Sequence, residues 1–304
     1  MAAATDADTP PLAADPPRPG PAPVAPVAHR TVIEPPSGWQ LLGLRELWRY
    51  RELLLTFVVR DVKVRYKQTV LGAAWAVLQP AMMMAVFTVL FGKLANLPTG
   101  GVPEPLFYLS GLLPWFFFSS SVVTASNSVL GAGGLITKVY FPRLAVPLSA
   151  VGAAFVDFVV SCGLLAVLLL AYGVAPTWNL LAAPLVVAIV GLFALGLGTG
   201  FAALNVVFRD FRYVVPFAVQ LGMYATPAIY FAAKAGEAES PSETIRLLIQ
   251  LNPLNSLITT FRAATVGGDI PWAGVGVAGL LSVATFFAGC LYFRRVEDRF
   301  ADVI

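Results

Sequence analysis

Polar and apolar residues alternate in a helical pattern over residues 44–67, just before the first long apolar stretch of the chain. The polar positions recur every three or four residues, which places them on one stripe of an α-helix. They are Arg45, Arg49, Glu52, Thr56, Arg60, Lys63 and Lys67. The opposite, mostly apolar face consists of Leu44, Leu47, Trp48, Leu54, Leu55, Val58, Val62 and Tyr66. The pattern predicts an amphipathic helix that lies in the headgroup plane of a membrane.

Six apolar stretches follow, and each is long enough to cross a bilayer, which takes about 20 mostly apolar residues in a helix. They are residues 70–91, 106–130, 146–172, 180–207, 214–231 and 273–293. Pro114 interrupts the second stretch, and Pro216 and Pro227 lie near the ends of the fifth. Neighbouring helices can satisfy the backbone groups that a proline frees. The sequence therefore predicts six transmembrane helices.

Residues 244–266 fit neither a span nor an ordinary loop. They are largely apolar but include Arg246, Asn252, Pro253, Asn255 and Arg262. Each half is too short to cross the membrane, so the segment predicts a pair of short interfacial or re-entrant helices that is broken at Asn252-Pro253. A partly buried outer loop is the alternative.

Composition places the whole chain in the membrane class. Hydrophobic residues make up 58% and charged residues 12%, whereas soluble domains carry about 25% charged residues. Residues 1–38, rich in Pro, Ala and Asp, cannot bury a core and predict a disordered cytoplasmic tail. Residues 39–304 are then one all-α transmembrane domain.

The basic residues predict the orientation, because cytoplasmic segments carry an excess of Lys and Arg. The N-terminal segment, the loops 131–145 and 208–213, and the C-terminus together hold 16 of the 20 basic residues. The other four are Lys93, Lys234, Arg246 and Arg262. We therefore expect both termini in the cytoplasm and the protein in the cytoplasmic membrane.

Catalytic and metal-binding motifs are missing from the sequence. It has no phosphate-binding Gly-x-x-x-x-Gly-Lys-[Ser/Thr] loop, no Gly-x-Ser-x-Gly elbow and no paired His ligands. Cys162 and Cys290 lie in apolar runs, and His29 is in the tail. We expect no catalytic residue, metal or cofactor in this chain, which leaves a carrier, a channel or a subunit of a larger machine.

Asp157 is a charged residue near the middle of the third predicted span. A carboxylate at the centre of a membrane helix costs about 2.5–3.5 kcal/mol and normally faces the interior of the bundle or a cavity. Asp157 is therefore either a polar point on a substrate path or a partner in a structural hydrogen bond to Ser, Thr or Asn of a neighbouring helix.

Aromatic residues are candidates for contact with a sugar. They are Trp115, Phe116, Phe117 and Phe118 after Pro114, then Tyr224 and Tyr230. Aromatic rings stack on sugar faces, but they also form the interfacial belt of membrane proteins and pack in cores. Trp115, Phe116, Tyr224 and Tyr230, with Asp157, are the residues we expect along a translocation path.

The first inner loop combines charge with aromatic residues, since Lys138 and Arg143 flank Tyr140, Phe141 and Pro142. Exposed aromatic side chains at the membrane edge favour a partner protein that covers them. The alternative is a simple positive-inside anchor, which is our interpretation of the smaller loop 208–212.

These motifs together resemble a known family. The longest match is Arg60-Asp61-Val-Lys63-Val-Arg65-Tyr66-Lys67-Gln68-Thr69-Val-Leu-Gly72-Ala-Ala-Trp75-Ala-Val-Leu-Gln79-Pro80. The later matches are Lys138-Val-Tyr-Phe141-Pro142-Arg143, Asn205-Val-Val-Phe208-Arg209-Asp210, Thr226-Pro227 with Tyr230, and Leu251-Asn252-Pro253. Residues from about 40 to 304 resemble the membrane subunit of polysaccharide ABC exporters. These are type-2 permeases for O-antigen, capsule and teichoic acid chains.

The resemblance implies a homodimer of six-span subunits with one ATPase subunit, which binds ATP and Mg, docked under each. Residues 44–67 would be the interface helix, and Lys138 to Arg143 would lie in or beside the coupling helix that docks on the ATPase. Residues 244–266, with Asn252 and Pro253 at their break, would close the exit. The tail is not part of the family pattern.

The implied substrate is a polysaccharide on a polyprenyl-diphosphate lipid, with membrane lipids and no nucleic acid as the other contacts. We expect Arg60, Lys63, Arg65 and Lys67 to attract its anionic head. Their alternative role is anchoring to the membrane surface and contact with the ATPase. Two other functions stay open, which are export of a drug or lipid and a non-conducting scaffold for a polysaccharide synthase.

Overall fold

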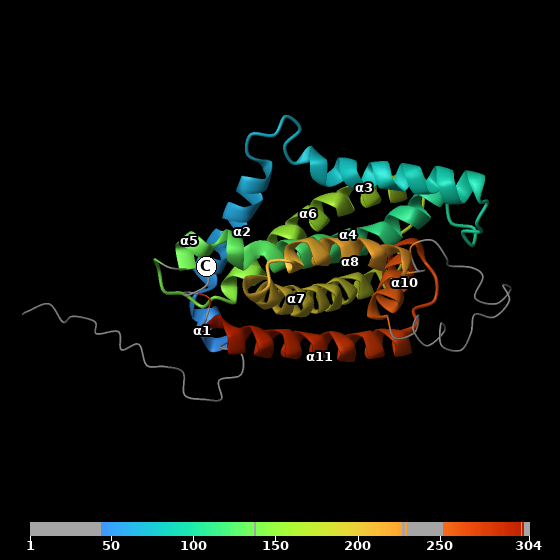
Figure 1. Cartoon of the computed structure of the whole chain (residues 1–304). Helices are drawn as coiled ribbons and strands as arrows, with labels where there is room; N and C mark the ends of the chain where they lie inside the picture. Colours follow the sequence, from blue (N-terminus) through green and yellow to red (C-terminus); the bar gives the residue numbers. More distant parts are fainter. Residues whose placement is uncertain (1–43, 137, 227–228, 230–251, 299, 301–304) are drawn as a thin grey trace, which may run out of the picture. The chain divides into compact units, whose positions relative to one another are not determined.

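The structure is a computed structural model that describes residues 44–136, 138–226, 229, 252–298 and 300. All regular structure in these residues is helical, which confirms the predicted all-α class. Figure 1 shows long helices running roughly side by side, with the short helices α1 (Leu44–Arg49) and α5 (Gly133–Ile136) at one end. The predicted tail 1–38 lies outside the described residues.

Within the described residues, five helical segments are long and apolar enough to cross a membrane, and each coincides with a predicted span. Three are the single helices α4 (Glu104–Gly131), α6 (Ala145–Ala171) and α11 (Trp272–Glu297). The other two combine α3 (Ala74–Phe87) with η1 (Thr88–Leu94), and η2 (Trp178–Ala182) with α7 (Ala183–Val207). Helix α4 continues through Pro114.

The predicted fifth span, residues 214–231, begins within α8 (Phe211–Tyr224). Residues 227–228, 230 and 231 lie outside the described part, and the 14 residues of α8 are too few to cross a bilayer by themselves. A count of six spans therefore stays a prediction.

Helix α4 is the centre of the bundle. In its most apolar window 78% of the residues are buried, against 11–28% in the other four segments. It packs against α3, α6, α7, α8 and α10 (Pro253–Val266), and α11 packs on the far side of α7 (Figure 1). A Cβ on Gly289 of α11 would collide with the carbonyl oxygen of Gly196 in α7. Such close backbone approach over small residues is typical of helix packing in membranes.

The predicted amphipathic helix forms as two helices, α1 and α2 (Arg51–Tyr66), which meet at Tyr50. The face of α2 that packs on α6 repeats every four residues and consists of Leu53, Leu54, Phe57, Val58, Asp61, Val62, Arg65 and Tyr66. Of the predicted apolar face, Leu55 and Trp48 are 62% and 71% exposed on the protein. The packed face includes two charged residues because α6 offers polar partners, and the Ser149 hydroxyl lies 3.0 Å from Asp61 Oδ2.

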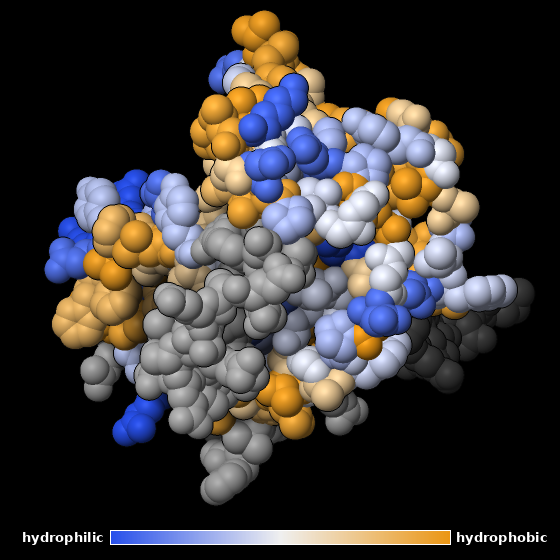
Figure 2. Space-filling view, turned by 90° about the vertical axis from the view of Figure 1, so that its right-hand side faces the viewer, coloured by the Kyte–Doolittle hydropathy of each residue, from blue (hydrophilic) through white to orange (hydrophobic). Residues whose placement is uncertain are grey.

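Helix α10 is the second half of the predicted re-entrant pair, and the first half lies outside the described residues. Asn252 precedes α10 with an extended backbone conformation, and its Oδ1 accepts a hydrogen bond from the Leu254 amide at 3.1 Å. This is an N-cap, and Pro253 suits the first helical position, where its missing N–H costs nothing. Figure 2 shows hydrophilic surface between hydrophobic edges at this end of the bundle. Lys93 in η1, Asn96 after it and Asp269 after α10 are exposed.

Candidate functional site

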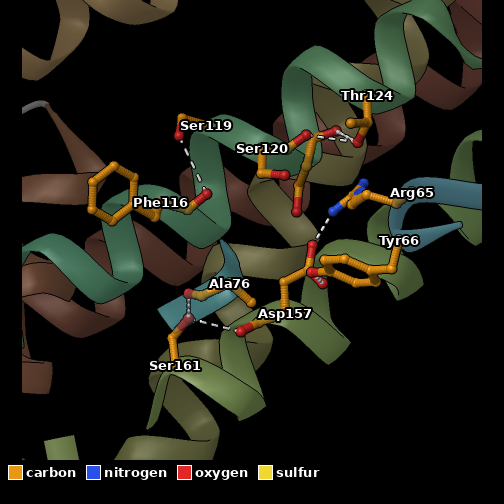
Figure 3. Close-up of polar contacts among 10 residues, drawn as sticks. Arg65, Tyr66, Ala76, Phe116, Ser119, Ser120, Thr124, Asp157 and Ser161 are labelled. Carbon is orange, nitrogen blue, oxygen red and sulfur yellow. Dashed lines mark hydrogen bonds and ion pairs between the residues drawn. The ribbon is translucent and has the colours of Figure 1, made fainter. Parts of the chain in front are cut away.

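Asp157 of α6 holds the end of α2. Its carboxylate accepts hydrogen bonds from Arg65 Nη1 and from the Tyr66 hydroxyl, and it forms an ion pair with Arg65 (Figure 3). The side chains of Arg65 and Asp157 are 28% and 19% exposed. The partners of Asp157 are thus two residues of the interface helix rather than a Ser, Thr or Asn of a neighbouring span.

Helix α3 begins beside this cluster. The Ser161 hydroxyl lies 2.7 Å from the carbonyl oxygen of Ala76 in α3 and 2.8 Å from that of Asp157 (Figure 3). Burial, the hydrogen bond to Asp157 and the negative charge of that carboxylate raise the pKa of Tyr66 to about 12. The Tyr66 phenol therefore stays protonated and acts as a hydrogen-bond donor at neutral pH.

The Arg65–Asp157 pair lies on the wall of a cavity of about 670 Å³ between α2, α3, α4, α6 and α8. Four of the five predicted path residues line it, namely Trp115, Phe116, Asp157 and Tyr224. The fifth, Tyr230, lies outside the described residues. The structure therefore brings together predicted side chains that are more than one hundred positions apart in the sequence.

The cavity wall mixes aromatic rings with small polar groups. Besides the predicted residues, it includes Trp75, Gln79, Ser119, Ser120, Thr124 and Gln220. The Ser119 hydroxyl donates to the Phe116 carbonyl at 3.2 Å, and that of Thr124 donates to the Ser120 carbonyl at 2.6 Å. Because these hydroxyl protons are used within α4, the oxygen lone pairs are what the two side chains offer to a ligand.

Sequence reasoning missed these polar residues, although the sequence carried a signal for them. Ser120 and Thr124 interrupt an apolar span four residues apart and share one face of the helix, with Ser119 next to them in the sequence. Trp75 and Gln79 stand four residues apart and also share a face of their helix. A search for polar stripes within the predicted spans would have found both groups.

The four residues predicted to attract the lipid headgroup do not lie together at the cavity. Only Arg65 of the four lines the cavity. Arg60 forms an ion pair with Asp61 at 2.8 Å, with its guanidinium 4.7 Å from the centre of the Phe57 ring. Lys63 and Lys67 are exposed.

The first inner loop differs from the prediction of exposed aromatic residues. Lys138 and Tyr140 are exposed, but Phe141 is only 4% exposed and Pro142 is buried. The Phe141 ring packs edge to face on Phe57 of α2, with 5.4 Å between ring centres. The prediction was wrong for Phe141 because α2 passes over the loop and covers its ring. Over residues 138–143, the exposed surface consists of Lys138, Val139 and Tyr140.

Further contacts fix the same loop to α1 and to the end of α11. The Tyr140 hydroxyl lies 3.4 Å from Glu46 Oε1 of α1. Arg143 donates to the carbonyl of Glu297 at the end of α11, and its guanidinium lies 5.9 Å from the centre of the Phe300 ring. A force applied to this loop would therefore reach α1, α2 and α11.

The residues predicted at the outer gate lie away from the cavity. Asn252 caps α10, and its Nδ2 donates to Thr226 Oγ1 at 3.1 Å. Sequence reasoning gave Arg262 no role beyond an outer basic residue, but it is only 6% exposed inside the bundle. Its Nε donates to the Phe107 carbonyl at 3.2 Å, and its guanidinium stacks 3.8 Å from the centre of the Phe107 ring.

The five apolar helices, with a polar and aromatic cavity among them, define a multi-pass α-helical membrane protein. Comparison with known sequences then assigns it. The chain belongs to the ABC-2 type transporter family, whose sequence pattern matches residues 52–266. This confirms the resemblance to type-2 ABC exporter permeases.

The match to individual relatives extends over nearly the whole length of each relative. It is 36% identical over 264 residues to the O-antigen export system permease protein RfbA of Myxococcus xanthus, which covers 86% of this chain and 98% of the relative. It is 27% identical over 258 residues to RfbA of Klebsiella pneumoniae, covering 83% and 95%. It is 23% identical over 246 residues to the polysialic acid transport protein KpsM of Escherichia coli, covering 79% and 92%.

Proposed function

We propose that this chain is the permease subunit of an ATP-driven exporter that moves a polysaccharide, carried on a polyprenyl-diphosphate lipid, across the cytoplasmic membrane. The relatives named for O-antigen export and polysialic acid transport support the polysaccharide class. The observation that carries the proposal is the cavity of about 670 Å³, where aromatic rings alternate with hydroxyl and amide groups. Rings stack on the apolar faces of sugars, and polar groups bind their hydroxyls weakly enough for a chain to keep moving.

ATP hydrolysis belongs to a separate ATPase in this proposal, with ATP and Mg bound by that partner. Two copies of the permease form a homodimer, and one ATPase docks under each at the exposed surface of Lys138, Val139 and Tyr140. The contact of Phe141 with Phe57 passes movement of the loop to α2. Both termini of the permease lie in the cytoplasm, as the basic residues of the sequence indicate.

A strain in which this chain can be depleted tests the proposal. We expect the surface polysaccharide to disappear while lipid-linked polysaccharide accumulates inside the cell. Normal surface display after depletion would contradict the proposal and favour export of another substrate. Loss of surface polysaccharide without internal accumulation would contradict it in favour of a synthase scaffold, because synthesis itself would have stopped.

A further inference from the structure

Arg65 differs from its basic neighbours on α2 in lining the cavity and in pairing with a carboxylate of another helix, α6. The cavity is lined by Arg65 and Tyr66, and Asp157 binds both of them (Figure 3). Asp157 lies twelve residues after the start of α6, which is about 18 Å along the helix at 1.5 Å per residue. The pair therefore stands away from the end of α6, on the wall of the cavity.

We propose that Arg65 and Tyr66 form the diphosphate-binding site of the cavity, and that Asp157 is a built-in competitor which holds both donors until a diphosphate displaces it. This inference rests on the proposed function and names the part of the substrate that the site recognises. It assigns binding of the headgroup to Arg65 and not to Arg60, Lys63 or Lys67, whereas the sequence offered no reason to prefer one of the four residues.

The exchange replaces one anionic acceptor by another at the same two donors, Arg65 and Tyr66. A guanidinium binds carboxylates and phosphates through the same planar fork, so a phosphate can take the place of the Asp157 carboxylate without moving α2. The Tyr66 hydroxyl, which donates to Asp157, can donate to a phosphate oxygen in the same way. A diphosphate offers more charge and more acceptor oxygens than one carboxylate, which favours the exchange.

The displaced carboxylate opposes the exchange. Asp157 is only 19% exposed, and a partly buried charge that loses its partner is destabilised. The free energy of diphosphate binding is therefore the difference between the gain from the new contacts and the cost of releasing Asp157. The resulting affinity stays low. Weak binding suits a transport site, because a ligand has to leave it as well as enter.

The same competition gives selectivity. Ordinary anionic phospholipids present a single phosphate diester, and neutral lipids present no charge that could displace the Asp157 carboxylate from Arg65. Asp157 would thus exclude the abundant bilayer lipids and admit only a headgroup that carries several negative charges. Without Asp157, Arg65 would bind any anionic lipid.

The test uses the full-length chain in phosphatidylcholine nanodiscs and a fluorescent polyprenyl diphosphate as the probe. We expect Asp157→Asn to bind the probe about tenfold more tightly, and Arg65→Gln about tenfold or more weakly, because charge-assisted hydrogen bonds are the strong ones. In Arg65→Gln, adding Asp157→Asn should strengthen binding by less than tenfold, because Tyr66 is then the remaining donor that is released. Phosphatidylglycerol should compete for the site in Asp157→Asn but not in the natural protein.

Two matched control variants are available on α2. Asp61→Asn removes a negative charge, as Asp157→Asn does, and Lys63→Gln removes a positive charge, as Arg65→Gln does. Asp61 and Lys63 do not line the cavity. Each should shift probe affinity by less than about twofold, the size of a screened surface effect. Arg65→Lys keeps the charge without the fork and should bind with intermediate affinity, which retains a readout if Arg65→Gln does not fold.

Competitors identify what the site recognises. Inorganic diphosphate should displace the probe, and uncharged polyprenol should not. If inorganic diphosphate binds but the lipid-linked probe does not, the site takes free diphosphate and the inference is overturned. It is also overturned if Asp157→Asn weakens binding, or if Lys63→Gln matches Arg65→Gln. These outcomes leave the proposed function standing, since that depends on the export defect of depleted cells.

Discussion

The contact between Phe57 and Phe141 joins the loop at residues 138–143 to α2. The rings pack edge to face, with 5.4 Å between centres, and are 6% and 4% exposed. Truncating a buried Phe to Ala costs about 3–5 kcal/mol, and an aromatic pair adds about 0.5–1.5 kcal/mol beyond burial. Phe57→Ala and Phe141→Ala should therefore each lower the free energy of unfolding by about 3 kcal/mol. The double variant should lose about 1 kcal/mol less than the sum of the two.

The functional assay is ATP hydrolysis stimulated by the permease, measured with its partner ATPase in proteoliposomes. Phe57→Ala and Phe141→Ala should each reduce this stimulation, because the loop then loses its contact with α2. Phe87→Ala is the matched control. Phe87 is 7% exposed and packs edge to face on Phe91 at 5.1 Å, but it lies in α3 and away from the loop. Equal loss of stimulation in Phe87→Ala and Phe57→Ala, or additive stabilities in the double variant, would refute the reasoning.

Three further predictions concern stability. Gly289→Ala should lower the melting temperature by overpacking worth about 1–3 kcal/mol, because its Cβ would meet Gly196, whereas Gly276→Ala in the same helix has open space and should not. Equal melting temperatures would show that α7 and α11 do not approach so closely. Asn252→Ala should cost about 1 kcal/mol of stability through loss of the α10 cap, and Asn252→Ser should restore most of it. The opposite order of the two variants would contradict the cap. The pKa of Tyr66, raised from 10.0 to about 12, gives a stability contribution that is fully present below pH 10 and is lost as the pH rises through 12. The difference in phenolate absorbance between the natural protein and Tyr66→Phe should therefore titrate near pH 12, and titration near pH 10 would rule out the contact with Asp157.

The spans were predictable because their signal is local. A run of apolar residues satisfies the length requirement by itself, and Asn252-Pro253 carries both the cap and the first residue of α10. The family followed from strings of residues that are contiguous in the sequence. Periodicity also indicated the helix at 44–67, although it did not reveal the break at Tyr50.

The site itself was less predictable because it depends on how helices are rotated against one another. Lys63 and Arg65 differ by two positions, which is about 200° around a helix, so one faces the bundle and the other does not. The partner of Asp157 lies 92 positions earlier in the chain. The burial of Phe141 depends on α2 passing over the loop, and no property of the loop sequence encodes that path.

Transport by the purified components tests the central claim most directly. The permease and its partner ATPase would be reconstituted in vesicles with a labelled polysaccharide on polyprenyl diphosphate, and movement to the opposite leaflet would be followed by protection from an added glycosidase. The account predicts movement that requires ATP and fails with Arg65→Gln but not with Lys63→Gln. A complex that hydrolyses ATP in these vesicles but leaves the lipid-linked polysaccharide on its original side would contradict the account.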